Sequence, residues 1–175
     1  LLSLGPNYAL NSEINSFTKF TMQRDDPISR RISALSEQKL QLIRKAWDPK
    51  TEKFRQSISI DDIRAVKQFF NLSSTDKGQR VVIIDSADDL QNASANALLK
   101  ILEEPPQRTT ILMISHNPST LLPTIKSRCR KLNLLPLSTE DLKQGLIQAI
   151  KPDDPISNEV YTLSEGSIGN AATLL

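Results

Sequence analysis

Two short apolar runs constrain the fold of this chain more than any other feature of its sequence. The run Val81–Ile84 is β-branched throughout and does not alternate with polar residues, and residues 109–115 form a second, mostly apolar run. A strand without alternation is typical of a parallel sheet that is buried on both faces. A helix-length segment separates the two runs, which is the spacing of a right-handed βαβ crossover. The sequence therefore predicts an α/β fold with a parallel sheet flanked by helices.

The segment between the two runs has the periodicity of an amphipathic helix. Its apolar residues recur at i, i+3, i+4 and i+7, starting from Ala95. Asn92 is expected to cap the N-terminus of this helix, and the sequence of residues 103–106, Glu-Glu-Pro-Pro, ends it. We expect the apolar stripe to pack under the sheet. The predicted contact joins Leu98, Leu99 and Leu102 of the helix to Val82, Ile84 and Leu112 of the strands.

The sequence before the first run predicts a further strand and a further helix. Residues 40–43 are expected to form the strand, which leads into a turn at residues 47–50. Ser59 and Asp62 have the spacing of a helix-capping box, so a helix is expected to begin there. Its apolar stripe consists of Ile63, Val66 and Phe70.

The pattern changes after the second run. A short helix is expected at residues 117–126 and a strand near residues 131–134, and beyond a boundary at Pro136 the pattern is helical throughout. The sequence thus predicts an α/β core over residues 1–136 and a helical unit over residues 137–175. Ser138 is expected to cap the first helix of the second unit, in which Leu142, Leu146 and Ile150 share a face. A second helix is expected over residues 157–164, with its end at Gly166, and a third is expected to begin near Ser167.

Composition excludes several classes of function. The chain has one cysteine and one histidine, so it can form neither an intrachain disulfide nor a cysteine-based structural zinc site. The formal net charge of +2 is too small to indicate a nucleic-acid partner by itself. The longest apolar runs are too short to span a bilayer, and residues 1–10 lack the basic start of a signal peptide. We expect a cytoplasmic protein and, because Leu1 is not methionine, a fragment of a longer chain.

Polar residues follow both predicted strands, at the edge where ligands bind in parallel α/β sheets. Asp85 and Ser86 follow the first strand, and Ser115, His116 and Asn117 follow the second. An apolar strand that ends in aspartate resembles a Walker B segment, in which the carboxylate holds Mg²⁺. The alternatives are a solvated acidic turn after the first strand and a plain helix cap after the second.

Longer motifs carry a specific resemblance. Residues 81–90, residues 96–106 and the Ser127-Arg128-Cys129 triplet together resemble the clamp-loader branch of the AAA+ ATPases. Residues 47–55 and residues 60–64 resemble the delta-prime lineage of the bacterial DNA polymerase III clamp loader in particular. The similarity runs from about residue 28 to the end of the chain.

The resemblance implies a RecA-like AAA+ core over residues 1–136, incomplete at its N-terminus, and the start of a helical lid domain over residues 137–175, without the collar domain of full-length relatives. The phosphate-binding sequence G-x-x-x-x-G-K-[ST] does not occur, but in relatives it precedes the region where this chain begins, so truncation is an alternative explanation. Two departures from active ATPases within the chain imply that it is not catalytic. Ser86 stands where an active ATPase has the glutamate that orients water, and a hydroxyl is a poor base. Gly169 stands at the sensor-2 position, where active relatives carry arginine.

Arg128 is the residue for which the resemblance implies a catalytic role. Within the Ser127-Arg128-Cys129 motif it would act in trans, as an arginine finger on a nucleotide held by a neighbouring subunit. The residues alone leave a surface ion pair as the alternative. Ser115 or Asn117 would lie at the sensor-1 position, and Cys129 is expected to be a packed side chain rather than a reactive thiol. A basic cluster, which suits DNA, a neighbour's nucleotide or solvent, consists of Lys126, Arg128, Arg130 and Lys131.

The resemblance therefore implies a non-catalytic delta-prime-type subunit that supports ATP-dependent loading of the sliding clamp. Its implied partners are the gamma/tau and delta subunits, with the clamp and primer-template DNA reached through the assembled complex and no membrane. ATP and Mg²⁺ would be bound by neighbouring subunits, and this chain would hold no cofactor or metal itself. It would be an enzyme only as part of the DNA polymerase III nucleotidyltransferase complex. The alternatives are an ATP-hydrolysing tau/gamma-type motor subunit and a stand-alone DNA-binding module.

Overall fold

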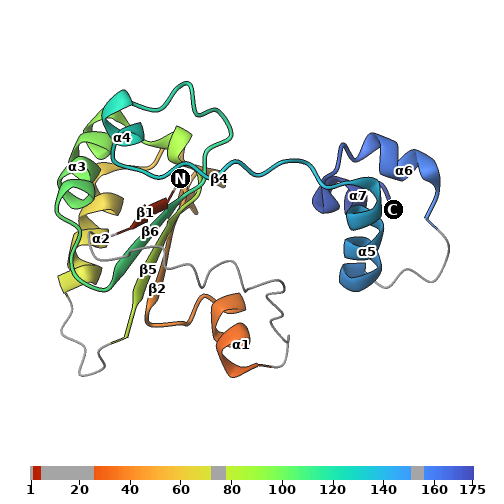
Figure 1. Cartoon of the computed structure of the whole chain (residues 1–175). Helices are drawn as coiled ribbons and strands as arrows, with labels where there is room; N and C mark the ends of the chain where they lie inside the picture. Colours follow the sequence, from red (N-terminus) through yellow and green to blue (C-terminus); the bar gives the residue numbers. More distant parts are fainter. Residues whose placement is uncertain (1, 5–25, 72–77, 151–155) are drawn as a thin grey trace, which may run out of the picture. The chain divides into compact units, whose positions relative to one another are not determined.

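The structure is a computed structural model that describes residues 2–4, 26–71, 78–150 and 156–175. The chain divides into two compact units, Leu1–Leu132 and Asn133–Leu175, and each is described by itself (Figure 1). None of the helices in the described ranges is long and apolar enough to cross a membrane.

A four-stranded sheet forms the centre of the first unit, with the strand order β1-β6-β5-β2. Strands β2 (Leu40–Ile43), β5 (Arg80–Ile84) and β6 (Thr109–Met113) run parallel to one another, so the predicted parallel sheet is confirmed. Strand β1 (Leu2–Leu4) pairs with β6 in the antiparallel direction, which the sequence did not predict.

Helix α2 (Ile60–Asn71) begins at the capping box that the sequence predicts. Both the backbone N–H and the hydroxyl of Ser59 donate to Asp62 Oδ2, at 2.8 and 2.7 Å, and the Asp62 N–H donates to Ser59 Oγ at 3.4 Å. These bonds satisfy N–H groups that have no partner inside the helix. The predicted apolar stripe is confirmed, since the buried residues of α2 are Ile63, Val66 and Phe70.

Helix α3 (Asn92–Glu103) packs beside α2 on one face of the sheet (Figure 1), but its buried face differs from the prediction. Leu98 and Leu102 are buried as expected, whereas Leu99 is only partly buried. Ile101 is buried instead of Leu99, because the buried face of α3 is centred on the side of the helix that carries Leu98 and Ile101. The N-cap residue is Gln91 rather than Asn92, without a side-chain capping bond.

The sheet alternates more than the uniform apolar runs suggested. In β5 the side chains of Val82 and Ile84 are buried, and those at the alternate positions are half-buried. In β6 the core-facing residues are Ile111 and Met113, so the predicted contact through Leu112 is wrong. Alternate residues of a strand point to opposite faces, and Leu112 therefore points away from α3.

Smaller elements complete the first unit. Helix α1 (Pro27–Ser33) begins at Asp26, whose carboxylate accepts the Ile28 N–H at 2.7 Å. The predicted turn after β2 is part of a hairpin of β3 (Trp47–Asp48) and β4 (Lys53–Phe54). The 3-10 helix η2 (Ala87–Asp89) follows β5.

The segment after β6 differs from the sequence prediction. The helix expected at residues 117–126 is reduced to α4 (Pro123–Lys126), which is preceded by a turn. Residues 131–134, expected to be a strand, have no regular secondary structure, and Leu132 and Leu134 are exposed. The apolar residues that suggested a strand therefore find no strand partner within the described part of the chain.

The second unit consists of helices α5 (Thr139–Ile150), α6 (Asn158–Leu163) and α7 (Ile168–Thr173). The predicted helix starts are confirmed: the N-caps of α6 and α7 are Ser157 and Ser167, and Ser138 Oγ accepts the Asp141 N–H at 3.1 Å in α5. The side chain of Ile150, expected on the apolar face of α5, lies outside the described residues. The core consists of Leu142, Leu146 and Ala171.

Gly166 joins α6 to α7 at a position that excludes other residues. Its φ of +73° lies in the left-handed region that favours glycine. A Cβ there would lie 2.7 Å from Pro136 Cβ and 2.8 Å from the backbone N and O of Leu137. The Gly166 carbonyl also accepts the Leu137 N–H at 3.0 Å. Gly166 lies where the sequence predicts the second helix to end. It also packs against residues 136–137, which lead into this unit, and is hydrogen-bonded to Leu137.

Candidate functional site

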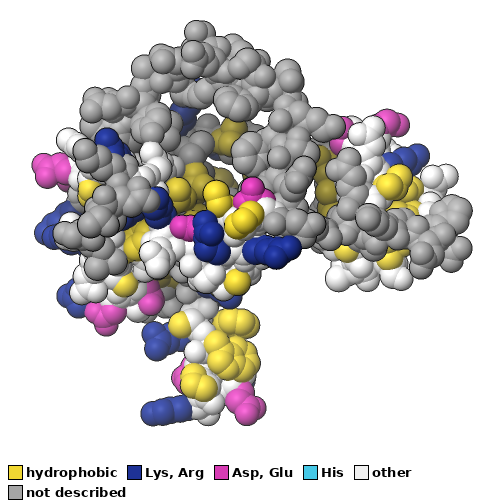
Figure 2. All heavy atoms as spheres, turned by 90° about the horizontal axis from the view of Figure 1, so that it is seen from below, with side chains coloured by type: hydrophobic (Ala, Val, Ile, Leu, Met, Phe, Trp, Pro, Cys, Tyr) yellow, Lys and Arg dark blue, Asp and Glu magenta, His cyan; other side chains and the backbone are white. Residues whose placement is uncertain are grey.

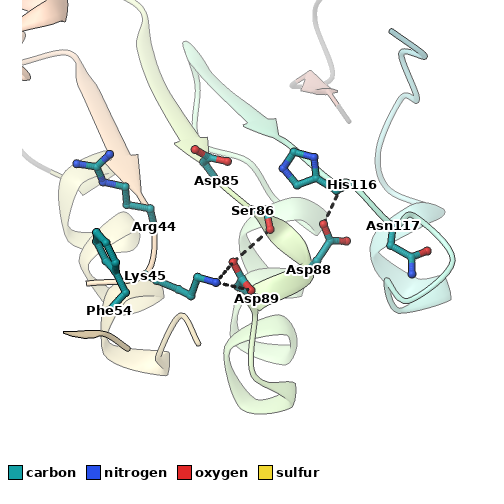
Figure 3. Close-up of a pocket in the computed structure, with 9 residues that line it drawn as sticks. All are labelled: Arg44, Lys45, Phe54, Asp85, Ser86, Asp88, Asp89, His116 and Asn117. Carbon is teal, nitrogen blue, oxygen red and sulfur yellow. Dashed lines mark hydrogen bonds and ion pairs between the residues drawn. The ribbon is translucent and has the colours of Figure 1, made fainter. Parts of the chain in front are cut away.

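A pocket of about 560 Å³ lies where β2, β5 and β6 end at one edge of the sheet (Figure 3). Parallel strands bring their carboxyl ends to the same edge, which is where ligands bind in such sheets. Asp85, Ser86 and Asn117, which the sequence analysis singled out, are brought together here. The complete lining is Arg44, Lys45, Phe54, Asp85, Ser86, Asp88, Asp89, His116 and Asn117.

Asp88 links the end of β5 to the end of β6. Its Oδ1 accepts the Ser115 hydroxyl at 2.7 Å, and its Oδ2 accepts the His116 backbone N–H at 2.7 Å. Burial alone would raise the pKa of Asp88, but hydrogen bonds from Ser115, His116 and Asn117 outweigh it and hold the pKa below its usual value. The side chain of Ser115, for which the resemblance implies the sensor-1 position, is therefore bound to a carboxylate of its own chain.

Asp89 engages the other side of the pocket. Lys45, which follows β2, lies 3.2 Å from both carboxylate oxygens of Asp89. The Ser86 hydroxyl donates to Asp89 Oδ2 at 3.3 Å (Figure 3), and Ser86 is buried. Ser86 is thus oriented by a neighbouring carboxylate rather than free to orient a water molecule.

Asp85 is the pocket carboxylate that makes no hydrogen bond or ion pair with any described residue, and Figure 3 shows it at the end of β5. Asn117 opens the turn that follows, because its carbonyl accepts the Thr120 N–H at 3.1 Å and its Oδ1 accepts the Ser119 hydroxyl. Within the described ranges no three His, Cys, Asp or Glu side chains are grouped to hold a metal ion.

Arg128 does not line this pocket. It follows α4, and its NH2 group lies 2.6 Å from Glu103 Oε1 at the end of α3. Its NH1 group donates to the Thr124 carbonyl at 2.9 Å and to Ser127 Oγ at 3.3 Å. The surface ion pair that the residues alone suggested is therefore present in this chain, and the role in trans stays a prediction.

The sequence profile of the family described as "DNA polymerase III, delta subunit" matches residues 18–138. The chain belongs to the DNA polymerase III delta-subunit family. The resemblance to the delta-prime lineage that the motifs indicated is confirmed by this match and by the relatives described next.

The relatives of this delta-subunit family member include DNA polymerase III subunit delta' of Pseudomonas aeruginosa, 40% identical over 119 residues. That alignment covers 66% of this chain and 36% of the relative. Subunit delta' of Escherichia coli is 34% identical over 123 residues, covering 70% of this chain and 37% of the relative. The chain thus spans a little over a third of the length of these curated relatives.

A solved structure also resembles this member of the delta-subunit family. It is a DNA polymerase III gamma subunit-related protein from Thermotoga maritima, with a TM-score of 0.57 and 26% identity. The match covers 92% of this chain and 46% of that one. The fold class predicted from the sequence is confirmed, while the interpretation of the second unit as a lid stays a prediction.

Cys129 and Gly169 are the remaining site residues that the sequence singled out, and neither lines the pocket. Cys129 packs against the core with its Sγ 3.9 Å from Met113 Sδ, and burial raises the pKa of its thiol. Its environment is that of a packed side chain, as the sequence analysis expected. Gly169 lies in the first turn of α7, where a Cβ would meet only Ser167 Oγ at 3.8 Å. A Cβ at Gly169 would therefore meet no close contact among the described residues.

All four residues of the predicted basic cluster are exposed, namely Lys126, Arg128, Arg130 and Lys131. Figure 2 shows Lys and Arg side chains spread among acidic and hydrophobic ones over the described surface in that view. Arg128 itself is neutralised by Glu103. What the cluster binds stays a prediction.

Sequence reasoning missed part of the pocket. Arg44 and Lys45 line it because they directly follow β2, and Phe54 reaches it from β4. Residues that directly follow a parallel strand lie at the ligand-binding edge of the sheet, and this reasoning singled out Asp85. The same reasoning applies to residues 44 and 45 after β2, so they could have been found from the sequence. Asp88 could not be assigned from sequence, since its role depends on the turn that aims it at β6.

Proposed function

We propose that this chain is part of a delta-prime-type subunit of the DNA polymerase III clamp loader, and that it supports ATP-dependent loading of the sliding clamp without hydrolysing ATP itself. The observation that carries the proposal is Ser86, a hydroxyl bound to Asp89 at the position after the strand-end aspartate, in a chain of this family. Its partners are other clamp-loader subunits of the gamma/tau and delta types, and it reaches the clamp and primer-template DNA through the cytoplasmic complex.

The charges in the pocket support the non-catalytic role. Of the two basic side chains in the pocket, Lys45 is already paired with Asp89, which leaves Arg44 as the one available to meet a phosphate. The general-base position carries Ser86, whose hydroxyl has a pKa far too high for that task. ATP and Mg²⁺ are therefore held by neighbouring subunits in this proposal, and the chain acts through its surface.

Arg128 is the surface residue that we propose acts on the neighbour. A guanidinium carries five N–H donors in a planar fork that suits phosphate oxygens. The Arg128 side chain is 33% exposed and sits beyond the short helix α4, so a neighbouring subunit can reach it. It would stabilise the charge that develops on the γ-phosphate of the neighbour's ATP.

The test uses the full-length subunit in the reconstituted complex, with Arg128→Ala, Arg128→Lys and Arg64→Ala. Arg64 is the control, because it is an exposed arginine that is paired with a carboxylate, Asp61, outside the basic cluster. We expect Arg128→Ala to assemble and to lower DNA-stimulated ATP hydrolysis and clamp loading, with poor rescue by lysine, which lacks the planar fork. Removal of a finger is typically worth about 10³–10⁵ in rate at one site, and several sites dilute that loss. Wild-type loading by the Arg128→Ala complex would refute the role in trans.

A motor subunit of the tau/gamma type is the second candidate. It is favoured by the tau subunit of Escherichia coli, which is 36% identical over 101 residues, covering 54% of this chain and 16% of that protein. Calorimetry of the full-length protein with ATP and Mg²⁺ separates the two. The delta-prime proposal expects weak or undetectable binding, and a low-micromolar dissociation constant (about 8 kcal/mol of binding free energy) favours the motor subunit.

A further inference from the structure

The Arg128 guanidinium is held at two of its three nitrogens by its own chain. NH2 pairs with Glu103 Oε1 at 2.6 Å, and NH1 donates to the Thr124 carbonyl at 2.9 Å. The Nε–H donates to no described residue, and NH2 carries a second hydrogen besides the one given to Glu103. Hydrogen bonds from NH1 and NH2 to its own chain therefore fix the guanidinium of Arg128, while the Nε–H and the second NH2 hydrogen can still bind a ligand.

The two acceptors belong to separate, well-anchored elements. Glu103 is the last residue of α3, directly after the buried Leu102, and Thr124 lies in α4 next to the buried Ile125. Packing fixes the backbone at both points, so the acceptors fix the direction of the guanidinium plane. A site built on packed elements of this kind holds its geometry more closely than one on a free loop.

We propose that Glu103 is a positioning residue that orients Arg128 toward a phosphate group presented by a neighbouring subunit. This inference rests on the proposed function, since it assigns Glu103 a role only if Arg128 acts in trans. Glu103 touches neither the nucleotide nor the reacting atoms. It reduces the freedom of a long side chain that would otherwise sample many rotamers before it meets its target.

The ion pair between Glu103 and Arg128 should affect the rate of ATP hydrolysis much more than the free energy of unfolding. Exposed pairs contribute little to the free energy of unfolding, and the Glu103 side chain is 47% exposed. Loss of Glu103 should therefore leave the melting temperature of the subunit almost unchanged. Misplacing a catalytic group by about 1 Å, in contrast, can lower a rate by about 100-fold. The effect of Glu103 should thus appear in the rate at one ATP site.

Glu104 provides the matched control. It is the adjacent exposed carboxylate and makes no hydrogen bond or ion pair with Arg128. Glu103→Ala and Glu104→Ala remove the same charge from neighbouring positions, so they change the overall field almost equally. Glu103→Gln keeps the shape of the side chain and one weak acceptor, and it replaces the alanine variant if that variant fails to fold.

The experiment is a double-mutant cycle in the reconstituted complex, read by single-turnover ATP hydrolysis and by clamp loading. We expect Glu103→Ala to lower the rate by up to about 100-fold at the affected site, Glu104→Ala to leave it unchanged, and Glu103→Gln to restore part of it. In the Arg128→Ala background, Glu103→Ala should have no further effect, because the residues act as one unit. A purely structural role for Glu103 would instead give additive losses.

The outcomes separate the two proposals. If Arg128→Ala lowers the rate but Glu103→Ala matches Glu104→Ala, the positioning role is overturned and the arginine finger stands. If Glu103→Ala raises the rate, Glu103 is a restraint on Arg128 and the positioning role is likewise overturned. If neither Arg128→Ala nor Glu103→Ala changes the rate, the proposed function in trans fails and the positioning role fails with it.

Discussion

Replacement of Leu98 by alanine tests the packing of α3 against the sheet. Leu98 is fully buried, and it lies among the core residues of the first unit. The change removes about three methylene equivalents, worth roughly 2.4 kcal/mol at about 0.8 kcal/mol each. A cavity left behind adds to this loss, so the total is expected at about 3–5 kcal/mol.

Urea denaturation followed by tryptophan fluorescence measures this loss in the unit that contains the change. Trp47 is the one tryptophan of the sequence, and it lies in the first unit, on the hairpin of β3 and β4. The midpoint of its transition should fall with Leu98→Ala. A change in Leu146, which is equally buried but in the second unit, should leave the Trp47 transition in place.

Leu99→Ala is the control within α3. Leu99 lies one position away and is only partly buried, so its truncation should cost about 1 kcal/mol or less. The prediction is therefore an order of effects, with Leu98 well above Leu99. Equal losses, or a larger loss at Leu99, would show that α3 turns a different face to the sheet and would refute the packing described above.

Two further predictions concern the pocket and the second unit. Since hydrogen bonds lower the pKa of Asp88, its charged form adds stability that is complete above about pH 4 and is lost as pH falls through the lowered pKa. Urea midpoints between pH 2 and 7 should show a smaller acid loss for Asp88→Asn, and a constant offset from wild type would contradict this. Gly166→Ala should destabilise α5–α7 by roughly 1–3 kcal/mol because of its φ of +73° and the contact with Pro136. Gly169→Ala, in which the new Cβ meets no close contact, should not lower the hydrogen-exchange protection of those helices. Equal losses of protection in the two variants would refute the strain argument.

Local patterns predicted those parts of the fold that depend on neighbours in sequence. The Ser59–Asp62 capping box and the stripe of α2 follow from spacing alone, and both are observed. The face of α3 was misjudged because apolar residues on both flanks, Leu99 and Ile101, leave the centre of the stripe undecided. The antiparallel strand β1 depends on pairing across most of the unit, which no local pattern contains.

The candidate site shows the same limit. Asp85 and Asn117 could be assigned because strand ends collect at one edge of a parallel sheet. The hydrogen bonds of the residues beside them could not be predicted. The bond from Ser115 to Asp88 spans 27 positions and depends on how the turn after β5 orients the Asp88 carboxylate. Sequence therefore located the edge where a ligand would bind and left open whether its charges are free.

The distribution of free and paired charges argues for where this chain acts. In the pocket, Lys45 is bound to Asp89 and Asp88 to the end of β6, while the side chains of Arg44 and Asp85 make no hydrogen bond or ion pair with any described residue. Only part of the pocket's charge is thus compensated by described residues. Arg128 is also paired, but it keeps donors to spare. An incoming phosphate can add to its interactions rather than replace them, and this supports the proposed role of Arg128 in trans.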